Sequence, residues 1–131
     1  MLKAAVLYAK DLEKLKAFYL AIGGNLTDSI DGEFAAISNG ETELVILQAP
    51  QDIASQIVIE DPPAVRSATP LKPIVGTTSI ADVLENLPGI GGRPVPGMKQ
   101  WKFRQYIVQD IVDAEGNVLQ LWQTERARSG R

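Results

Sequence analysis

The sequence contains neither histidine nor cysteine in its 131 residues. Without cysteine there are no disulfides and no thiol chemistry. This absence is also consistent with the cytoplasm, the compartment that we expect for the protein. Without histidine the chain lacks the commonest metal ligand and the usual general base near neutral pH. Thiol-based and imidazole-based sites are therefore both excluded.

Long apolar runs and strongly basic stretches are also missing. No apolar run approaches the roughly 18–20 residues of a membrane span, and the N-terminal residues lack the long apolar region of a signal peptide. A formal net charge of −3 argues against binding to a phosphate backbone. The basic C-terminal tail, with Arg126, Arg128 and Arg131, is too short to change that balance. We therefore expect neither a membrane nor a nucleic acid as a partner.

What the chain does contain is typical of a globular protein. Hydrophobic residues make up 45% of the sequence, and charges of both signs are present. The length suits one compact domain, which we expect to span residues 1–131. Within it we predict a first module at about 1–49, a connection at 50–70, a second module at about 71–124 and a tail at 125–131.

Apolar periodicity predicts one strand, one helix and three further strands in the first module. Asp11 is a candidate N-cap, the apolar residues that follow recur at helical spacing, and Gly23-Gly24 ends the pattern. Asp31-Gly32 and Asn39-Gly40 are strong hairpin signals. The expected elements are a strand at 3–9, a helix at 11–22 and strands at 25–29, 33–38 and 42–49.

The second module repeats this order. Ser79 is a plausible N-cap, and Pro88-Gly89 ends the helical pattern that follows it. The connection is rich in proline and holds one short strand-like run at 56–60. Laying Ala4–Asp11 over Val75–Asp82 supports an internal duplication, because a helix-opening Asp ends both stretches. The expected elements are a strand at 71–77, a helix after Ser79 and strands at 93–97, 103–112 and 118–123.

The last two strands form the most informative stretch, Tyr106–Gln123. Two apolar-rich runs flank the turn Asp113-Ala-Glu-Gly-Asn, in which Gly116 can supply a positive φ and the Asp113 carboxylate can accept backbone N–H groups. In the second run Leu119 and Leu121 share one face, which suits a covered core. Gln120 and Trp122 lie on the opposite face, directed either to solvent or to a cavity.

This hairpin resembles the Asp-Pro-x-Gly-Asn-x-x-Glu segment of the vicinal oxygen chelate superfamily, which includes glyoxalase I, extradiol dioxygenases and bleomycin-resistance proteins. Ala114 replaces the proline, and Gln120 replaces the metal-binding glutamate. The stretch VLYAKDLEKLKAFYLAIGG resembles the opening strand and helix of the same superfamily. The resemblance implies an α+β fold in which two βαβββ modules form a U-shaped, cleft-forming mixed sheet with helices outside.

The resemblance also locates the metal-ligand positions of the metal-dependent members. In this chain they fall at Ala4, Leu44, Val75 and Gln120. Three of these side chains cannot coordinate a cation, and Gln120 offers one neutral oxygen, whereas zinc and iron sites need about three protein ligands. We therefore expect no metal and no other cofactor. An all-oxygen site built from Asp and Glu elsewhere remains open.

What remains is similar to the metal-free branch that contains the bleomycin-resistance proteins, whose members are typically homodimers. We therefore expect a homodimer that binds a small organic molecule in its cleft. Its expected ligand-binding residues are Tyr8, Trp101, Arg104, Gln120 and Trp122. One alternative is an enzyme of the same fold (a lyase, isomerase or dioxygenase) with an atypical metal site. Another is a structural dimer whose cleft is vestigial.

Several of these residues admit two interpretations from the sequence. Trp101, Arg104 and Tyr106 resemble the aromatic and arginine stretch that precedes the last hairpin in the superfamily. Arg104 can clamp a carboxylate or phosphate, or it can pair with Asp110, which we expect at the surface. Trp122 is either a partly buried edge aromatic or a cavity-lining residue. Tyr8 points toward the cleft if the superfamily register holds.

Overall fold

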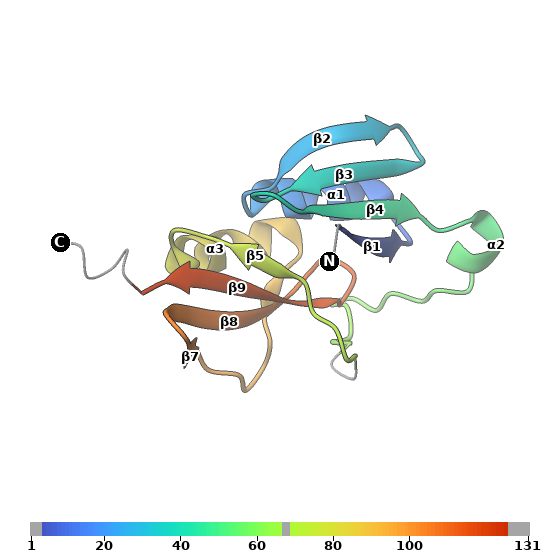
Figure 1. The fold of residues 1–131 in the computed structure, drawn as a ribbon. Helices are drawn as coiled ribbons and strands as arrows, with labels where there is room; N and C mark the ends of the chain where they lie inside the picture. The colour runs from blue at the N-terminus through green and yellow to red at the C-terminus, as the bar shows by residue number, and fades with distance from the viewer. Residues whose placement is uncertain (1–3, 67–68, 126–131) are drawn as a thin grey trace. The chain divides into compact units, whose positions relative to one another are not determined.

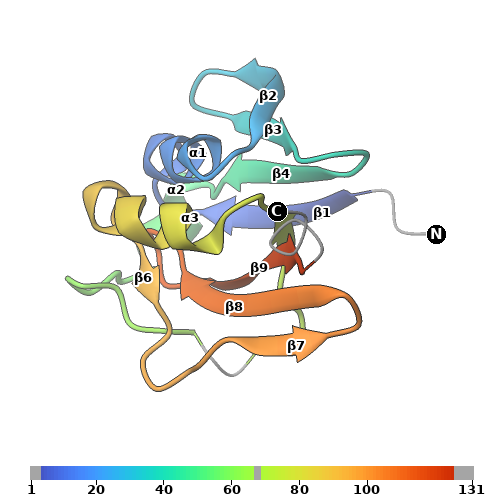
Figure 2. The ribbon, with the colours of Figure 1, turned by 90° about the vertical axis from the view of Figure 1, so that its left-hand side faces the viewer.

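In the computed structural model, which describes residues 4–66 and 69–125, the chain forms two compact units, 1–64 and 65–131. Their boundary lies inside the segment 50–70 that the sequence predicts as a connection. Within the described residues, no helix is long and apolar enough to cross a membrane. Figures 1 and 2 show the elements of both units.

The first unit has a β-α-β-β-β order followed by one short helix. Its elements are β1 (Ala4–Ala9), α1 (Leu12–Ala21), β2 (Asn25–Ile30), β3 (Phe34–Ser38), β4 (Glu43–Gln48) and α2 (Gln51–Ala54). The strands form one sheet in the order β1-β4-β3-β2. β1 runs parallel to β4, and the other pairs are antiparallel.

Helix α1 covers one face of this sheet because its apolar residues recur on one side. Asp11 caps the helix by accepting a hydrogen bond from the Lys14 amide at 3.2 Å. Leu15 and Phe18 are fully buried, and the helix contacts β3 and β4 (Figure 2). The opposing sheet residues Ala35 and Ile46 are also fully buried. The core of the first unit therefore lies between α1 and the two central strands.

The second unit repeats the order with one interruption. Its elements are β5 (Ile74–Gly76), α3 (Ile80–Asn86), the 3₁₀-helix η1 (Leu87–Ile90), β6 (Arg93–Pro94), β7 (Trp101–Phe103), β8 (Tyr106–Val112) and β9 (Val118–Thr124). The sheet order β5-β9-β8-β6 matches that of the first unit, and β5 is parallel to β9. Both β6 and β7 pair with β8, so together they take the place that β2 holds in the first unit.

Two predictions of secondary structure are wrong. The single strand expected at 103–112 is two strands, because the chain turns at Arg104 and Gln105 and Phe103 pairs with Tyr106. The strand-like run at 56–60 forms no strand, and the regular element in that region is α2. The turn was missed because neither Arg nor Gln is a usual turn residue.

The predicted turn between β8 and β9 is confirmed. Asp113 Oδ1 accepts hydrogen bonds from the Glu115 amide at 2.8 Å and the Asn117 amide at 2.9 Å. Gly116 has a φ of 91°, the left-handed region that favours glycine. Leu119 and Leu121 are fully buried, as the alternation of the strand predicts.

One glutamine in each unit ties the final strand to the start of the helix. In the first unit Gln48 Oε1 accepts the Leu12 amide at 2.9 Å. In the second unit Gln123 Oε1 accepts the Ile80 amide at 2.7 Å. Each amide belongs to the first residue of its helix. This shared contact makes the two units structural repeats and aligns them residue by residue.

Candidate functional site

The sheet of the second unit has two chemically different faces. Leu119, Leu121 and Gln123 lie on the face that carries α3, where Gln123 meets the helix start. Strand register places Gln120 opposite Asp110, and Trp122 opposite Val108, on the other face. Sequence alternation predicts this separation, and the structure confirms it.

The face opposite α3 carries a continuous group of four rings, which we call the aromatic row: Trp101, Phe103, Tyr106 and Trp122. Ring centroids are 6.1 Å apart between Trp101 and Phe103, 5.5 Å between Phe103 and Trp122, and 4.7 Å between Tyr106 and Trp122. These separations are typical of stabilising aromatic pairs. The two rings on β7 are accessible to solvent: Trp101 is 41% exposed and Phe103 is 37% exposed.

Arg104 stands at the end of the aromatic row. Its guanidinium carbon lies 5.0 Å from the centroid of the Phe103 ring, a cation–π contact. Its φ of 56° is the only positive value among the described residues other than glycine. A side chain raises the energy of this backbone region, so the turn holds an arginine at a conformational cost.

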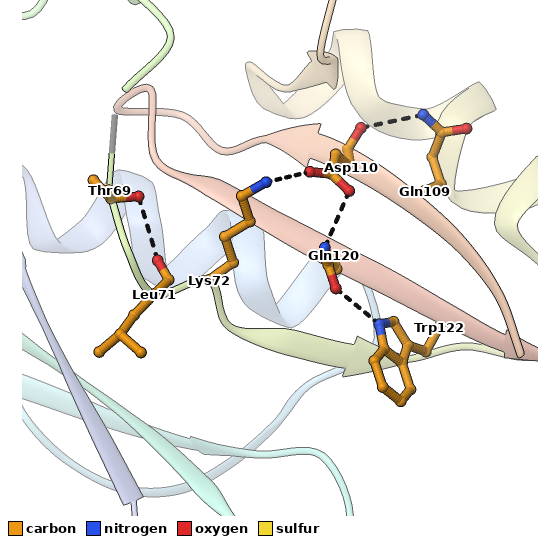
Figure 3. A network of polar contacts seen from close by, with 7 residues as sticks. All are labelled: Thr69, Leu71, Lys72, Gln109, Asp110, Gln120 and Trp122. Atoms are coloured by element: carbon orange, nitrogen blue, oxygen red, sulfur yellow. Dashed lines mark hydrogen bonds and ion pairs between the residues drawn. The ribbon is translucent and has the colours of Figure 1, made fainter. Parts of the chain in front are cut away.

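A chain of polar contacts lies beside the aromatic row on the same face (Figure 3). The Lys72 ammonium is 2.7 Å from Asp110 Oδ2. The Gln120 amide donates to Asp110 Oδ1 at 3.3 Å, and Gln120 Oε1 accepts the Trp122 indole N–H at 3.0 Å. The four residues form one relay, which we call the Lys72–Trp122 relay.

The relay corrects two expectations about Asp110. Its side chain is 1% exposed instead of lying at the surface. The ion pair that neutralises it comes from Lys72, whereas the Arg104 guanidinium lies over Phe103. A buried carboxylate is costly unless it is paired and hydrogen-bonded. Both oxygens of Asp110 have such a partner, so the burial is compensated.

Aligning the repeats also corrects two of the expected metal-ligand positions. The pair Ile74 and Gln120 in the second unit is equivalent to the pair Val6 and Val45 in the first. Counting back from the helix N-cap Ser79, rather than from Asp82, gives Lys72 as the equivalent of Ala4. The four positions are therefore Ala4, Val45, Lys72 and Gln120, with Val45 and Lys72 in place of Leu44 and Val75.

These four side chains do not fit a divalent cation. Alanine and valine offer no ligand atom, and the ammonium of Lys72 is itself a cation that occupies the nearby carboxylate. Within the described ranges, 4–66 and 69–125, no three His, Cys, Asp or Glu residues gather in a way that could hold a metal. Divalent metals bind sites with several anionic or imidazole ligands, so the chemistry at these positions disfavours them.

Tyr8 belongs to the first unit, where it lies on the sheet face opposite α1. It is 61% exposed, and its neighbour on the same face, Val6, is 54% exposed. The other four predicted site residues belong to the second unit, which brings Trp101, Gln120 and Trp122 onto one face and sets Arg104 against it.

Solved structures similar to this chain include a bleomycin resistance determinant encoded on transposon Tn5, with 17% identity, a TM-score of 0.56 and coverage of 95% of this chain and 98% of the other. The fosfomycin resistance protein FosX from Listeria monocytogenes, solved with Mn(II) and a dihydroxypropylphosphonic acid, has 16% identity and a TM-score of 0.64, with coverage of 98% and 94%. A hypothetical protein from S. aureus has 14% identity and a TM-score of 0.66, with coverage of 94% and 96%.

These neighbours match nearly the whole chain, and the same α+β order of two βαβββ units runs through it. The chain therefore has the glyoxalase/bleomycin-resistance fold, which confirms the resemblance in fold. Within that class, its named neighbours include bleomycin- and fosfomycin-resistance proteins. No protein-family model matches the sequence, and the comparison with curated proteins gave no match either.

Sequence reasoning overlooked Lys72 and Phe103 as members of this face, and it named Tyr106 only as part of the aromatic and arginine stretch. Lys72 could have been found from the helix N-cap Ser79. Lys72 lies seven residues before Ser79, as Ala4 lies seven residues before the N-cap Asp11. The spacing of Trp101 and Phe103, two residues apart, carried the signal for a separate strand before the turn. The ion pair with Asp110 had no local signal, because 38 residues separate its partners.

Proposed function

We propose that the protein is a metal-free, small-molecule-binding member of the vicinal oxygen chelate superfamily that acts as a homodimer. Its proposed ligand-binding residues are Trp101, Arg104, Gln120 and Trp122 of the second unit and Tyr8 of the first. In this proposal the two units act together as one domain, spanning residues 1–131. The observation that carries the proposal is the aromatic row, in which Trp101 and Phe103 are accessible on the sheet face opposite α3. Small-molecule sites use such aromatic surface together with a few placed polar groups.

We propose a metal-free protein because of the positive charge of Lys72. Its ammonium stands at the repeat equivalent of Ala4, where the resemblance to the superfamily implies a metal ligand, and it pairs with the carboxylate of Asp110. A divalent cation bound there would have to displace or repel that charge. Structural neighbours that include a bleomycin-binding protein solved with bleomycin and a fosfomycin resistance protein support a role in small-molecule binding.

A thermal-shift screen of varied small organic molecules tests the binding function. A ligand that binds only the folded state raises the unfolding temperature by mass action. The Trp101→Ala variant, which removes one accessible ring, should lose most of the shift caused by any compound that stabilises the natural protein. A screen in which no compound stabilises the protein would favour the structural-dimer alternative.

Metal analysis of protein purified without chelators tests the metal-free part independently. We expect zinc, iron, nickel and manganese each at well below one ion per chain. A stoichiometric, tightly bound ion would favour the enzyme alternative. Sedimentation equilibrium tests the proposed dimer.

A further inference from the structure

We infer that the ligand is a planar aromatic molecule carrying an anionic group such as a carboxylate. This inference rests on the proposed function and adds the chemical class of the ligand. Three independent features of the second unit lead to it: the accessible rings, the unneutralised Arg104, and the way in which the Lys72–Trp122 relay uses the other polar groups of the face.

The aromatic row favours a flat ligand. Trp101 and Phe103 are presented side by side on β7 with 41% and 37% of their surfaces exposed, and Val108 opposite Trp101 is fully buried. The accessible apolar part of this face is therefore mainly ring surface, beside one aliphatic side chain, Ile74, which is 51% exposed. Ring faces recognise other rings by offset or edge contacts, which favour planar aromatic groups over branched aliphatic ones.

Arg104 supplies the charge that would select an anion. No ion pair joins Arg104 to a carboxylate within the part of the chain that the structure describes, whereas Lys72 and Lys102 are paired with Asp110 and Glu125. Residues 93–109 contain Arg and Lys but neither Asp nor Glu, although the whole chain has a net charge of −3. A guanidinium matches the geometry of a carboxylate with two parallel hydrogen bonds.

The Lys72–Trp122 relay makes Arg104 the principal polar contact of the surface. The Trp122 indole N–H is already donated to Gln120, and the Gln120 amide is already donated to Asp110 (Figure 3). Groups that are satisfied inside the protein gain little by binding a ligand. Trp122 therefore offers its ring face to a ligand, and the relay fixes the orientation of that ring. The polar group of the ligand would bind the Arg104 guanidinium.

Isothermal titration calorimetry with three probes of one shape tests this inference: 2-naphthoate, 2-naphthamide and 2-(aminomethyl)naphthalene. We expect 2-naphthoate to bind about tenfold more tightly than the uncharged amide, which corresponds to one charge-assisted contact at a partly exposed site. The cationic probe should bind most weakly. Raising the ionic strength should reduce the advantage of the anion, because salt screens exposed charges.

Substitutions at Arg104 test whether its guanidinium causes the tighter binding of 2-naphthoate. Arg104→Gln should bring the affinities for naphthoate and naphthamide together, and Arg104→Lys should retain part of the difference. Lys102→Gln is the matched control, because it removes one positive charge two residues away, from a position on β7 opposite Ile107 that lies on the other face. It should leave the preference unchanged. A thermal unfolding curve for each variant establishes that it is folded.

The possible results separate this inference from the proposed function. Equal affinity for naphthoate and naphthamide, or a preference that survives Arg104→Gln, overturns the anionic ligand class while leaving small-molecule binding intact. Stabilisation by aliphatic compounds alone also overturns the ligand class. The absence of binding by every compound, including those of the thermal-shift screen, overturns both.

Discussion

At the scale of single residues, Arg104 combines an unfavourable backbone conformation with an exposed charged side chain. Its φ of 56° lies in the region where a Cβ atom raises the energy by about 1–2 kcal/mol. The cation–π contact with Phe103 returns about 0.5–1 kcal/mol at an exposed site. The backbone cost of Arg104 therefore exceeds what its contact with Phe103 returns, so this arginine does not stabilise the turn.

Comparing Arg104→Gly with Arg104→Ala isolates the backbone cost. Both variants lose the guanidinium and its contact, and they differ in the Cβ atom at a positive φ. We expect the glycine variant to be more stable than the alanine variant by about 1 kcal/mol in urea unfolding. Equal stabilities would show that this turn carries no conformational strain.

The ion pair between Lys72 and Asp110 predicts a stability effect at the same scale. Lys72→Met should lower the free energy of unfolding by about 2–3 kcal/mol, because it leaves a buried carboxylate without its counter-charge. The loss should be smaller than for a fully buried pair, because the Lys72 side chain is 31% exposed and Gln120 still donates to Asp110.

The double variant Lys72→Met with Asp110→Asn is the matched control for that experiment. It removes the buried charge together with its partner, so it should recover more than half of the lost stability in urea unfolding. If the single variant were as stable as the natural protein, Asp110 would not depend on Lys72.

At the scale of elements, α1 and α3 each begin where a glutamine of the last strand of the unit meets the first amide of the helix. Gln123 is 8% exposed, and it accepts the Ile80 amide at a buried position. Gln48 accepts the Leu12 amide and also donates to the Ala9 and Lys10 carbonyls. These contacts satisfy amides that a helix start otherwise leaves without partners.

Replacing Gln123 by leucine should therefore loosen α3. We expect a loss of about 1–3 kcal/mol, because the Ile80 amide would be left buried without an acceptor. Hydrogen exchange should show the Ile80 amide among the sites that lose most protection. The control is Gln100→Leu at an exposed position, which should change stability by no more than about 0.5 kcal/mol.

The connection between α1 and β2 depends on a glycine for a different reason. A Cβ atom at Gly24 would lie 2.3 Å from Ile37 Cγ2 and 2.8 Å from the Tyr19 carbonyl oxygen. Gly24→Ala should therefore cost about 1–3 kcal/mol through overpacking, measured by thermal or urea unfolding. Gly89→Ala meets nothing within 4 Å and serves as the control; an equal loss in both variants would refute the packing explanation.

At the scale of the whole molecule, both sheets leave apolar side chains on the face opposite their helix. In the first unit Val6 and Ile30 are at least half exposed, and in the second Trp101 and Phe103 are more than a third exposed. Exposed apolar surface of this kind marks interaction sites. It is consistent with the proposed homodimer and with the proposed ligand surface.

Sedimentation equilibrium at micromolar concentrations should give a mass of about twice the 14.2 kDa of one chain. Dissociation on dilution should follow mass action, so the unfolding temperature should rise with protein concentration. A single species of monomer mass at all concentrations would contradict the homodimer and leave the aromatic row as the basis of binding within one chain.

Much of the architecture follows from the sequence because local patterns determine it. The N-caps Asp11 and Ser79, the turn at Asp113 and Gly116, and the alternation around Leu119 and Leu121 each act within a few residues. Those signals also placed Gln120 and Trp122 on the face away from the core. The double β-α-β-β-β order and the fold resemblance follow from them.

The composition of the site was decided by tertiary structure. Sequence could not pair Lys72 with Asp110, because a contact across 38 residues has no local signature. It also could not predict the turn at Arg104, because positive φ is rare for arginine and arises when surrounding pairing imposes it. Short-range stereochemistry therefore determined the elements, whereas long-range strand pairing decided which charges and rings share a face.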